Sequence, residues 1–286
     1  MKTIGIIPNL LKDTELEITR NVVEWLIDKG YKPLGTSHIA EHVEGLYPCE
    51  SEEALFEESD ILIAIGGDGT ILAVAEKASV ADVPIIGINL GRLGFLADIE
   101  PQDIAFYLEK LLGGNYHIQK RMMLRAKIIA PDGKEHIYNA LNDINITRGN
   151  ASRLSEFEIL VNHELCDVYP ADGIIVSTPT GSTAYNLSAG GPIVLPHTKA
   201  YILTPICPHT IYSKSIILAE EDVVQIKTCN DDNMNMALNI DGNTKMYLTP
   251  HHFIQIDKSP YVTKLIKLSE LKFFEILRKK IVERRR

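Results

Sequence analysis

The chain has 286 residues, of which 45% are hydrophobic, and its formal net charge is −9. This length predicts one large domain or two medium domains with ordinary hydrophobic cores. The acidic balance argues against a protein that wraps nucleic acid or lies on an anionic membrane, so we expect neither as a partner.

The cysteines are scattered along the chain, at Cys49, Cys166, Cys207 and Cys229. The absence of a C-x-x-C pair favours reduced thiols over a zinc site or a disulfide framework. Pro8 and Asn9 interrupt the first apolar run, which therefore does not read as a signal peptide. No apolar run approaches the length of a membrane span. We expect a soluble, cytoplasmic protein.

Up to Tyr116, short apolar runs alternate with helical patterns. The expected strands are 3–7, 60–65 and 84–88, and the expected helices are 15–29, 51–59, 70–78 and 101–112. This alternation predicts a doubly wound, Rossmann-like α/β domain with a parallel sheet.

After Tyr116 the helical period is largely lost. Hairpins are expected within 124–139 and 156–168, and further strands at 216–218, 223–229, 236–240, 253–257 and 261–268. Many short strands at close spacing predict a β-rich domain, a β-sandwich. A last helix is expected at 269–286, with an apolar stripe of Leu271, Phe274, Leu277 and Ile281 that packs back on the first domain. The predicted domains are 1–115 with 269–286, and 116–268.

The segment 60–70, DILIAIGGDGT, combines a buried-strand pattern, a glycine turn and the start of a helix. Glycines between a strand and a helix N-terminus let backbone N–H groups approach a phosphate. Asp68 is unusual in a pure phosphate cradle, because a carboxylate repels phosphate. It indicates a metal-coupled or hydroxyl-activating role, with a simple helix cap as the alternative.

A second unusual segment is 179–192, PTGSTAYNLSAGGP. Its glycines and small hydroxyl residues can bring amides and hydroxyls close to a polar ligand, while Tyr185 offers a ring for stacking. The alternative is a turn of small residues packed against a sheet.

Together, the two segments closely resemble the NAD kinase family, which phosphorylates the adenosine ribose 2′-hydroxyl of NAD. The GGDG pattern alone is shared with diacylglycerol-type lipid kinases and sugar-phosphate kinases, whereas GSTAYNLSAGGP is much more specific. The resemblance extends through NLGRLGFLAD at 89–98, ALND at 140–143, YPADG at 169–173, LTPICPH at 203–209 and Asp241-Gly242. The family has a Rossmann-like domain followed by a β-rich domain. This order matches the alternating strands and helices predicted before Tyr116 and the strands predicted after it.

The resemblance implies that Asp68 is the catalytic base that accepts the proton of the ribose hydroxyl. Gly66, Gly67 and Gly69 would let the donor approach the backbone. ATP or polyphosphate is the implied donor, with Mg²⁺ held mainly through its phosphates. A homodimer or homotetramer is the implied assembly.

The implied NAD contacts lie mostly in the predicted second domain. Asn142 and Thr183 would contact adenine, Asp143 the ribose, and Asp172 the nicotinamide end, while Phe95 would cover the adenine pocket. Many bacterial members have Glu where this chain has Asp143, so the reach of that acid differs. The remaining assignments are Ala184, Tyr185, Asn186 and Ser188 in the specific segment, Arg153 toward phosphates, and Asn243 toward another polar group.

Two rival functions stay open from the residues alone. A lipid kinase of the diacylglycerol kinase type would share the GGDG turn but needs a membrane-facing surface. A non-catalytic NAD(P)-binding regulator would keep the pocket without turnover. His38 and His42 have one-turn helical spacing, but no third ligand is apparent, so we expect a solvated face there rather than a metal site.

Overall fold

The computed structural model describes residues 2–97, 99–149, 155–210, 213–228, 236–249, 251–268 and 273–283. The chain divides into two compact units. Unit 1 comprises Met1–Lys120 and Thr263–Arg286, and unit 2 comprises Arg121–Val262. Among the described residues, no helix is both long and apolar enough to cross a bilayer.

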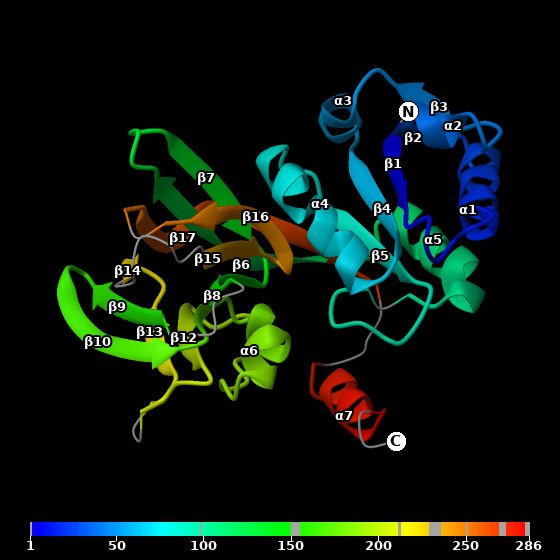
Figure 1. Cartoon of the computed structure of the whole chain (residues 1–286). Coiled ribbons are helices and arrows are strands. Elements are labelled where there is room, and N and C mark those ends of the chain that lie inside the picture. The colour runs from blue at the N-terminus through cyan, green and yellow to red at the C-terminus, as the bar shows by residue number, and fades with distance from the viewer. Residues whose placement is uncertain are drawn as a thin grey trace. The chain divides into compact units, whose positions relative to one another are not determined.

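Unit 1 contains a parallel sheet with the strand order β3-β2-β1-β4-β5 (Figure 1). Its strands are β1 (Thr3–Pro8), β2 (Lys32–Thr36), β3 (Tyr47–Cys49), β4 (Ile61–Gly66) and β5 (Ile85–Asn89). Its α-helices are α1 (Glu17–Asp28), α2 (Ser37–Ala40), α3 (Glu52–Glu57), α4 (Asp68–Val80), α5 (Ile104–Leu112) and α7 (Phe273–Glu283). A 3₁₀ turn, η1 (Pro101–Asp103), precedes α5.

Helices cover both faces of this sheet, as alternation along β1 requires. Ile4 and Ile6 belong to one apolar core with Val22 of α1 and Leu108 of α5. The intervening Gly5 points the other way, where an added Cβ would lie 3.3 Å from the Leu55 side chain of α3. Figure 1 shows α1 and α5 on one side and α3 and α4 on the other. The predicted doubly wound arrangement is confirmed.

Two strands of unit 1 were not predicted. β2 has the sequence KPLGT and β3 the sequence YPC, and each contains a proline, which weakens a strand pattern. They form the edge of the sheet beyond β1. The helix predicted at 70–78 begins earlier, at Asp68, because Gly67 is its N-cap.

Unit 2 is built of two antiparallel layers. The first is a six-stranded sheet in the order β13-β12-β11-β8-β15-β16. Its strands are β8 (Asp143–Arg148), β11 (Gly173–Ser177), β12 (Ala200–Ile206), β13 (Ile216–Ala219), β15 (Met236–Ile240) and β16 (Asn243–Leu248). The second layer contains β6 (His117–Ile129), β7 (Glu135–Ala140), β9 (Ser155–Val161), β10 (Glu164–Ala171), β14 (Val224–Thr228) and β17 (Phe253–Lys267).

One apolar core joins these layers. Ile146 of β8 and Leu203 of β12 belong to the same buried cluster as Phe157 of β9 and Ile254 of β17. Inward-facing residues from both sheets therefore form a common interior, which confirms the predicted sandwich. Burying this apolar surface is the main source of the unit's stability.

The two strands predicted at 253–257 and 261–268 are one strand, β17, so the predicted break was wrong. Its Ile254 and Ile256 pair with β14, and its Leu265 pairs in parallel with Ile85 of β5. The exposed Pro260 lies between these two pairings. Proline lacks an N–H donor, but a strand continues through it where no ladder bond is needed from that position.

Among the described side chains of α7, the residue that is buried is not one of those in the predicted apolar stripe. Ile276 is buried, whereas Phe274 is 59% exposed, so the prediction was wrong for Phe274. Leu271 and the side chain of Ile281 lie outside the described residues. The ring of Phe273 lies 5.7 Å from that of Phe95, between centroids, so α7 contacts the loop after β5.

Candidate active site

The glycine turn after β4 has a backbone that only glycine adopts readily. Gly66 and Gly67 have φ angles of 158° and 151°, which side chains rarely adopt. A Cβ on Gly66 would lie 2.3 Å from the hydroxyl of Thr70, and one on Gly67 would lie 3.0 Å from Nζ of Lys12. This turn therefore requires glycine at both positions, because neighbouring side chains occupy the space that a Cβ would need.

A lysine and a helix N-terminus supply positive charge at the turn. Nζ of Lys12 donates to the carbonyl of Gly66 at 2.8 Å. The turn also caps α4, whose first N–H groups carry the positive end of the helix dipole. Lys12 was not predicted, because a lone lysine in a loop has no distinguishing pattern. The arrangement suits an anionic group such as a phosphate.

Asp68 is the first residue of α4, and its carboxylate accepts hydrogen bonds from consecutive backbone N–H groups. Phe95 donates to Oδ2 at 2.9 Å, while Leu96 and Ala97 donate to Oδ1 at 2.9 and 3.0 Å. A Cβ on Gly94 would lie 1.9 Å from Oδ1, so this approach requires glycine there. The carboxylate of Asp68 therefore holds the loop 94–97 in place. This role differs from a simple cap of α4, the alternative considered from the sequence.

Two lysines hold the same loop and were not predicted. The buried Lys267 donates to the carbonyl of Leu96 at 2.7 Å. Nζ of Lys280 lies 3.6 Å from Oδ2 of Asp68 and 4.6 Å from the centroid of the Phe95 ring. The predicted pair Asp68 and Phe95 is therefore brought together in unit 1, with a cation beside both.

In unit 2, the turn before β8 is held by a half-buried acid, Asp241. Its carboxylate accepts from the N–H groups of Leu141, Asn142 and Asp143 at 2.8, 2.7 and 3.0 Å. Its own N–H donates to the carbonyl of Asp143 at 3.0 Å. Burial and the charge of Asp143 raise the pKa of Asp241 to about 7, although the three N–H donors act in the opposite direction. Asp241 belongs to a motif shared with the NAD kinase family, but the sequence pattern alone predicts no role for it.

The side chains of the two predicted neighbours Asn142 and Asp143 differ in availability. Asn142 is half-buried, and its carboxamide makes no hydrogen bond with any described residue. Asp143 is 3% exposed and accepts from Nδ2 of Asn145 at 2.9 Å. Burial raises the pKa of its carboxyl group. Asn142 therefore offers both donor and acceptor to a ligand, while Asp143 is largely enclosed.

The specific segment folds into η2 (Gly181–Thr183) and α6 (Tyr185–Ser188). Gly181 lies against the Asn142 turn, because a Cβ there would lie 2.1 Å from the carbonyl oxygen of Asn142. Thr178 also donates to that carbonyl, at 2.8 Å. The structure thus brings the two predicted motifs together within unit 2.

Asn186 has a structural role in this segment. Its Nδ2 donates to the carbonyls of Ser182 and Pro192 at 3.3 and 3.0 Å. Its Oδ1 accepts from the hydroxyl of Thr204 at 2.7 Å. The side chain is fully buried, so its polar atoms are satisfied within the protein.

The rest of the segment is unevenly exposed. Thr183 is buried and donates to the Thr180 carbonyl at 3.4 Å, Ala184 is half-buried, and Ser188 is exposed. Tyr185 is 41% exposed. Partial burial raises the pKa of its phenol, with Cys207, Asp143 and Asp172 as nearby negative groups. Tyr185 therefore lies in the same electrostatic neighbourhood as the two predicted acids.

The other predicted residues lie at the edges of this region. Asp172 forms an ion pair with Arg148, with 3.1 Å between Oδ1 and Nε. Asn243 is exposed, and its Nδ2 lies 3.5 Å from the carbonyl oxygen of Asp241. Arg153 lies outside the described residues. Gly69 is in the first turn of α4, where an added Cβ would meet nothing within 4 Å.

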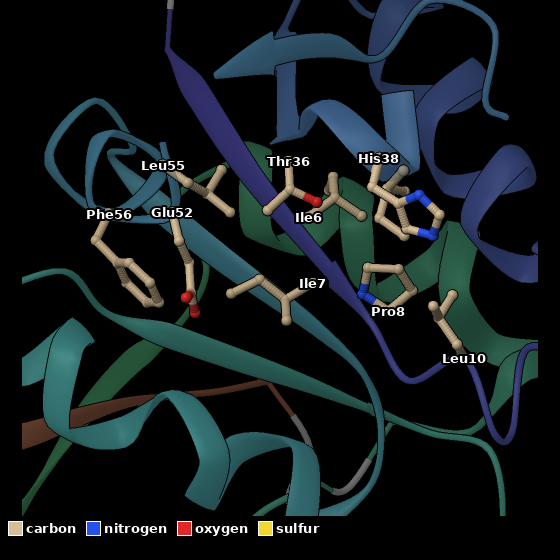
Figure 2. A pocket seen from close by; sticks show the side chains of 10 residues that line it. Ile6, Ile7, Pro8, Leu10, Thr36, His38, Glu52, Leu55 and Phe56 are labelled. Atoms are coloured by element: carbon tan, nitrogen blue, oxygen red, sulfur yellow. The ribbon is translucent and has the colours of Figure 1, made fainter. Parts of the chain in front are cut away.

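A cavity of about 230 Å³ in unit 1 lies apart from these residues. Figure 2 shows His38, Pro8 and Leu10 at one end of it and Glu52 and Phe56 at the other. None of the predicted site residues that the structure describes lines this cavity. It lies beside the carboxyl ends of β1 and β2.

Comparison with known proteins gives a consistent result across the chain. Residues 4–116 match the ATP-NAD kinase N-terminal domain, and residues 141–268 match the ATP-NAD kinase C-terminal domain. An NAD kinase from Caldanaerobacter subterraneus subsp. tengcongensis is 44% identical over 284 residues, covering 99% of this chain and 100% of the relative. An NAD kinase from Thermoanaerobacter pseudethanolicus is 42% identical with the same coverage.

Two solved structures share the fold. The yeast NADH kinase complexed with NADH aligns with a TM-score of 0.90 and 24% identity, covering 98% of this chain and 87% of that chain. An NAD kinase from Archaeoglobus fulgidus in complex with ATP aligns with a TM-score of 0.75 and 24% identity, covering 96% of this chain and 98% of that chain.

Proposed function

Because the chain belongs to the ATP-NAD kinase family, we propose that it transfers the terminal phosphoryl group of ATP to the adenosine ribose 2′-hydroxyl of NAD, giving NADP. The observation that carries this proposal is the position of Asp68. Its carboxylate stands at the glycine turn that opens α4, at a helix N-terminus suited to a phosphate.

In the proposed reaction, the ribose oxygen bonds to the γ-phosphorus as the bond from that phosphorus to the bridging oxygen of ADP breaks. The hydroxyl proton passes to the Asp68 carboxylate. Phosphoryl transfer depends mainly on positioning and on neutralising phosphate charge. A base that accepts the proton contributes a further factor of about 10²–10⁴ in rate.

On the donor side, the ammonium group of Lys12, which lies against the Gly66-Gly67 turn, supports a phosphate subsite. Lys12 is a compact cation on a flexible stem, so it can move from the Gly66 carbonyl to a phosphate oxygen. Gly69 supports the same subsite, since nothing lies within 4 Å of where its Cβ would be.

Mg²⁺ prefers oxygen ligands and commonly binds through substrate phosphates. The described residues form no cluster of three histidine, cysteine or acidic ligands around Asp68. Asp68 is then the one carboxylate at the glycine turn, which fits an ion held mainly by the phosphates of ATP. The ion would offset phosphate charge during transfer.

On the acceptor side, the free carboxamide of Asn142 supports recognition of the adenine edge, and the exposed ring of Tyr185 supports stacking. Asp143 can take a ribose hydrogen bond only at the rim of its enclosed carboxylate. The roles proposed for Phe95, Asp172, Thr183, Ala184, Asn186, Ser188, Asn243 and Arg153 stay predictions, as do polyphosphate as a donor, the homodimer or homotetramer and the cytoplasmic location.

The test is NADP formation from NAD, ATP and Mg²⁺ by the wild-type chain and by Asp68→Asn. In the variant, Oδ1 can still accept from Leu96 and Ala97, whereas the amide nitrogen cannot accept from Phe95, so circular dichroism must show a native fold. With the fold retained, kcat is expected to fall about 10²–10⁴-fold. Asp28→Asn, an exposed acid at the end of α1, is the matched control and should retain full activity.

Full activity in Asp68→Asn would overturn the assignment of the base. No NADP from the wild type despite saturable NAD binding would favour the non-catalytic regulator. Phosphorylation of a diglyceride without NADP formation would favour the lipid kinase.

A further inference from the structure

α2 and the residue pair that follows it carry a cluster of ligating side chains. His38, Glu41 and His42 are all exposed, and their ligand atoms lie within 4.8 Å of one another. The three side chains form the solvated face that the sequence predicts, and Glu41 places a carboxylate oxygen beside the two histidines, a third potential ligand that the histidine spacing alone does not indicate. The three residues come from one short stretch of chain, so this cluster is local to unit 1.

The geometry of the histidine pair suits a shared ion. The imidazole rings of His38 and His42 are 5.6 Å apart between centroids and nearly perpendicular, at 87°. Zinc binds imidazole nitrogen and carboxylate oxygen at roughly 2.0–2.2 Å, so the ligand atoms must approach by about 1 Å. Exposed side chains can make this movement by small rotations.

The cluster has an open side. Both histidines line a cavity of about 310 Å³ together with Thr14, Glu15 and Arg20. His38 also lines the cavity shown in Figure 2. An ion held by three protein ligands at this place would keep a coordination position for water or a small anion, as three-ligand zinc sites do.

One cation, Arg20, lines the same cavity as the two histidines. Arg20 is engaged with the chain, since its guanidinium donates to the carbonyls of Glu15 and His42, at 2.6 Å and 3.4 Å. The bond to His42 also holds the backbone that presents one ligand.

We propose that His38, Glu41 and His42 form a binding site for a divalent transition-metal ion such as Zn²⁺ or Ni²⁺. Imidazole ligands suit these ions, whereas Mg²⁺ prefers oxygen ligands alone. The site is therefore separate in chemistry from the Mg²⁺ that accompanies ATP.

The test uses the full chain treated with a chelator and then titrated with Zn²⁺ and, separately, Ni²⁺ by calorimetry. We expect one equivalent to bind, with affinity reduced at least about tenfold in His38→Ala, His42→Ala and Glu41→Gln and lost in the double histidine variant. His117→Ala, an exposed histidine outside the cluster, is the matched control and should bind like the wild type.

The exposed Cys166 and Cys207 could also bind zinc. A Co²⁺ titration separates them, because thiolate ligands produce strong near-ultraviolet charge-transfer absorption and nitrogen or oxygen ligands do not. Weak visible bands that vanish in the double histidine variant would support the site. Unchanged stoichiometry in that variant, thiolate absorption alone, or no binding by the wild type would overturn the proposal. Circular dichroism confirms that each variant is folded.

Discussion

Lys280 of α7 lies with its Nζ 3.6 Å from Oδ2 of Asp68, the acid at the start of α4. The same nitrogen is 4.6 Å from the centroid of the Phe95 ring. The two side chains of the pair are only 26% and 28% exposed, so solvent screens their interaction incompletely. This contact links the C-terminal helix to the turn proposed to bear the catalytic base.

Replacing Lys280 with Met should loosen α7. Removing the ion pair and the cation–π contact is expected to lower the free energy of unfolding by about 0.5–1 kcal/mol. The midpoint of thermal unfolding should fall by about 1–3 °C, and cleavage of the C-terminal helix by protease should become faster. Lys279→Met, at an exposed neighbouring lysine, is the control. Equal effects of both substitutions would contradict a specific role for Lys280.

Replacing Gly69 or Gly94 with alanine should have opposite effects on the free energy of unfolding. A Cβ on Gly69 meets nothing within 4 Å, so Gly69→Ala should preserve or raise stability by up to about 1 kcal/mol. Its activity should nevertheless fall if the donor approaches this backbone. Gly94→Ala would place its Cβ 1.9 Å from Oδ1 of Asp68 and should lower both stability, by about 1–3 kcal/mol, and kcat.

The measurements are urea unfolding and the kinetics of NADP formation on both glycine variants. Full activity in a stable Gly69→Ala protein would exclude close approach of the donor at this residue. An unaffected Gly94→Ala protein would show that Asp68 tolerates displacement.

Asn142 and Asn186 are a matched pair that separates binding from folding. Asn142→Ala removes a carboxamide with no described partner, so stability should change by less than about 0.5 kcal/mol while KM for NAD rises about tenfold. Asn186→Ala removes the partner of Thr204 and of two carbonyls and should cost about 2–4 kcal/mol. A stable, fully folded Asn186→Ala protein would contradict this division, as would an Asn142→Ala protein with unchanged KM.

Asp241 should make stability depend on pH. Its pKa rises to about 7 in the folded protein, from an ordinary value of about 4. The folded state therefore holds a proton that the unfolded chain releases, and the free energy of unfolding should fall as pH rises from about 4 through about 7. Asp143, whose pKa is also raised, contributes in the same direction.

Urea unfolding at several pH values between about 5 and 8 measures this dependence. In Asp241→Asn the slope should become shallower, leaving the contribution of Asp143. Glu164→Gln, at an exposed acid of β10, should leave the slope unchanged. A wild-type stability that is flat across this range would contradict the raised pKa of Asp241.

Several elements were predictable because their patterns are local. The apolar run of β4 and the glycines that follow it predicted a buried strand and a turn, and the structure has both. β2 and β3 were missed because their prolines and short length weaken any strand pattern, and they persist through pairing within the parallel sheet. The break predicted near Pro260 was wrong because pairings on both sides of it keep β17 extended.

The partners of the candidate site residues were not predictable from local pattern. Asp241 supports the Asn142 turn from about a hundred residues away, and Lys280 reaches Asp68 from a helix near the chain's end. Such contacts depend on how distant segments pack, which no spacing along the chain encodes. The same reason explains why the role of Asn186 was not predictable. It was predicted to contact a ligand, but its side chain is fully buried and hydrogen-bonded within the protein.

The sequence by itself determined the two-part architecture and the residue types of the candidate site, because periodicity and glycine turns are local properties of the chain. It also predicted Asp68 as the acid of the turn. Only the tertiary structure decided which polar side chains remain exposed, since burial and hydrogen-bond partners depend on how distant segments pack. Asp143 and Asn186 are enclosed by such partners, whereas Asn142 is open.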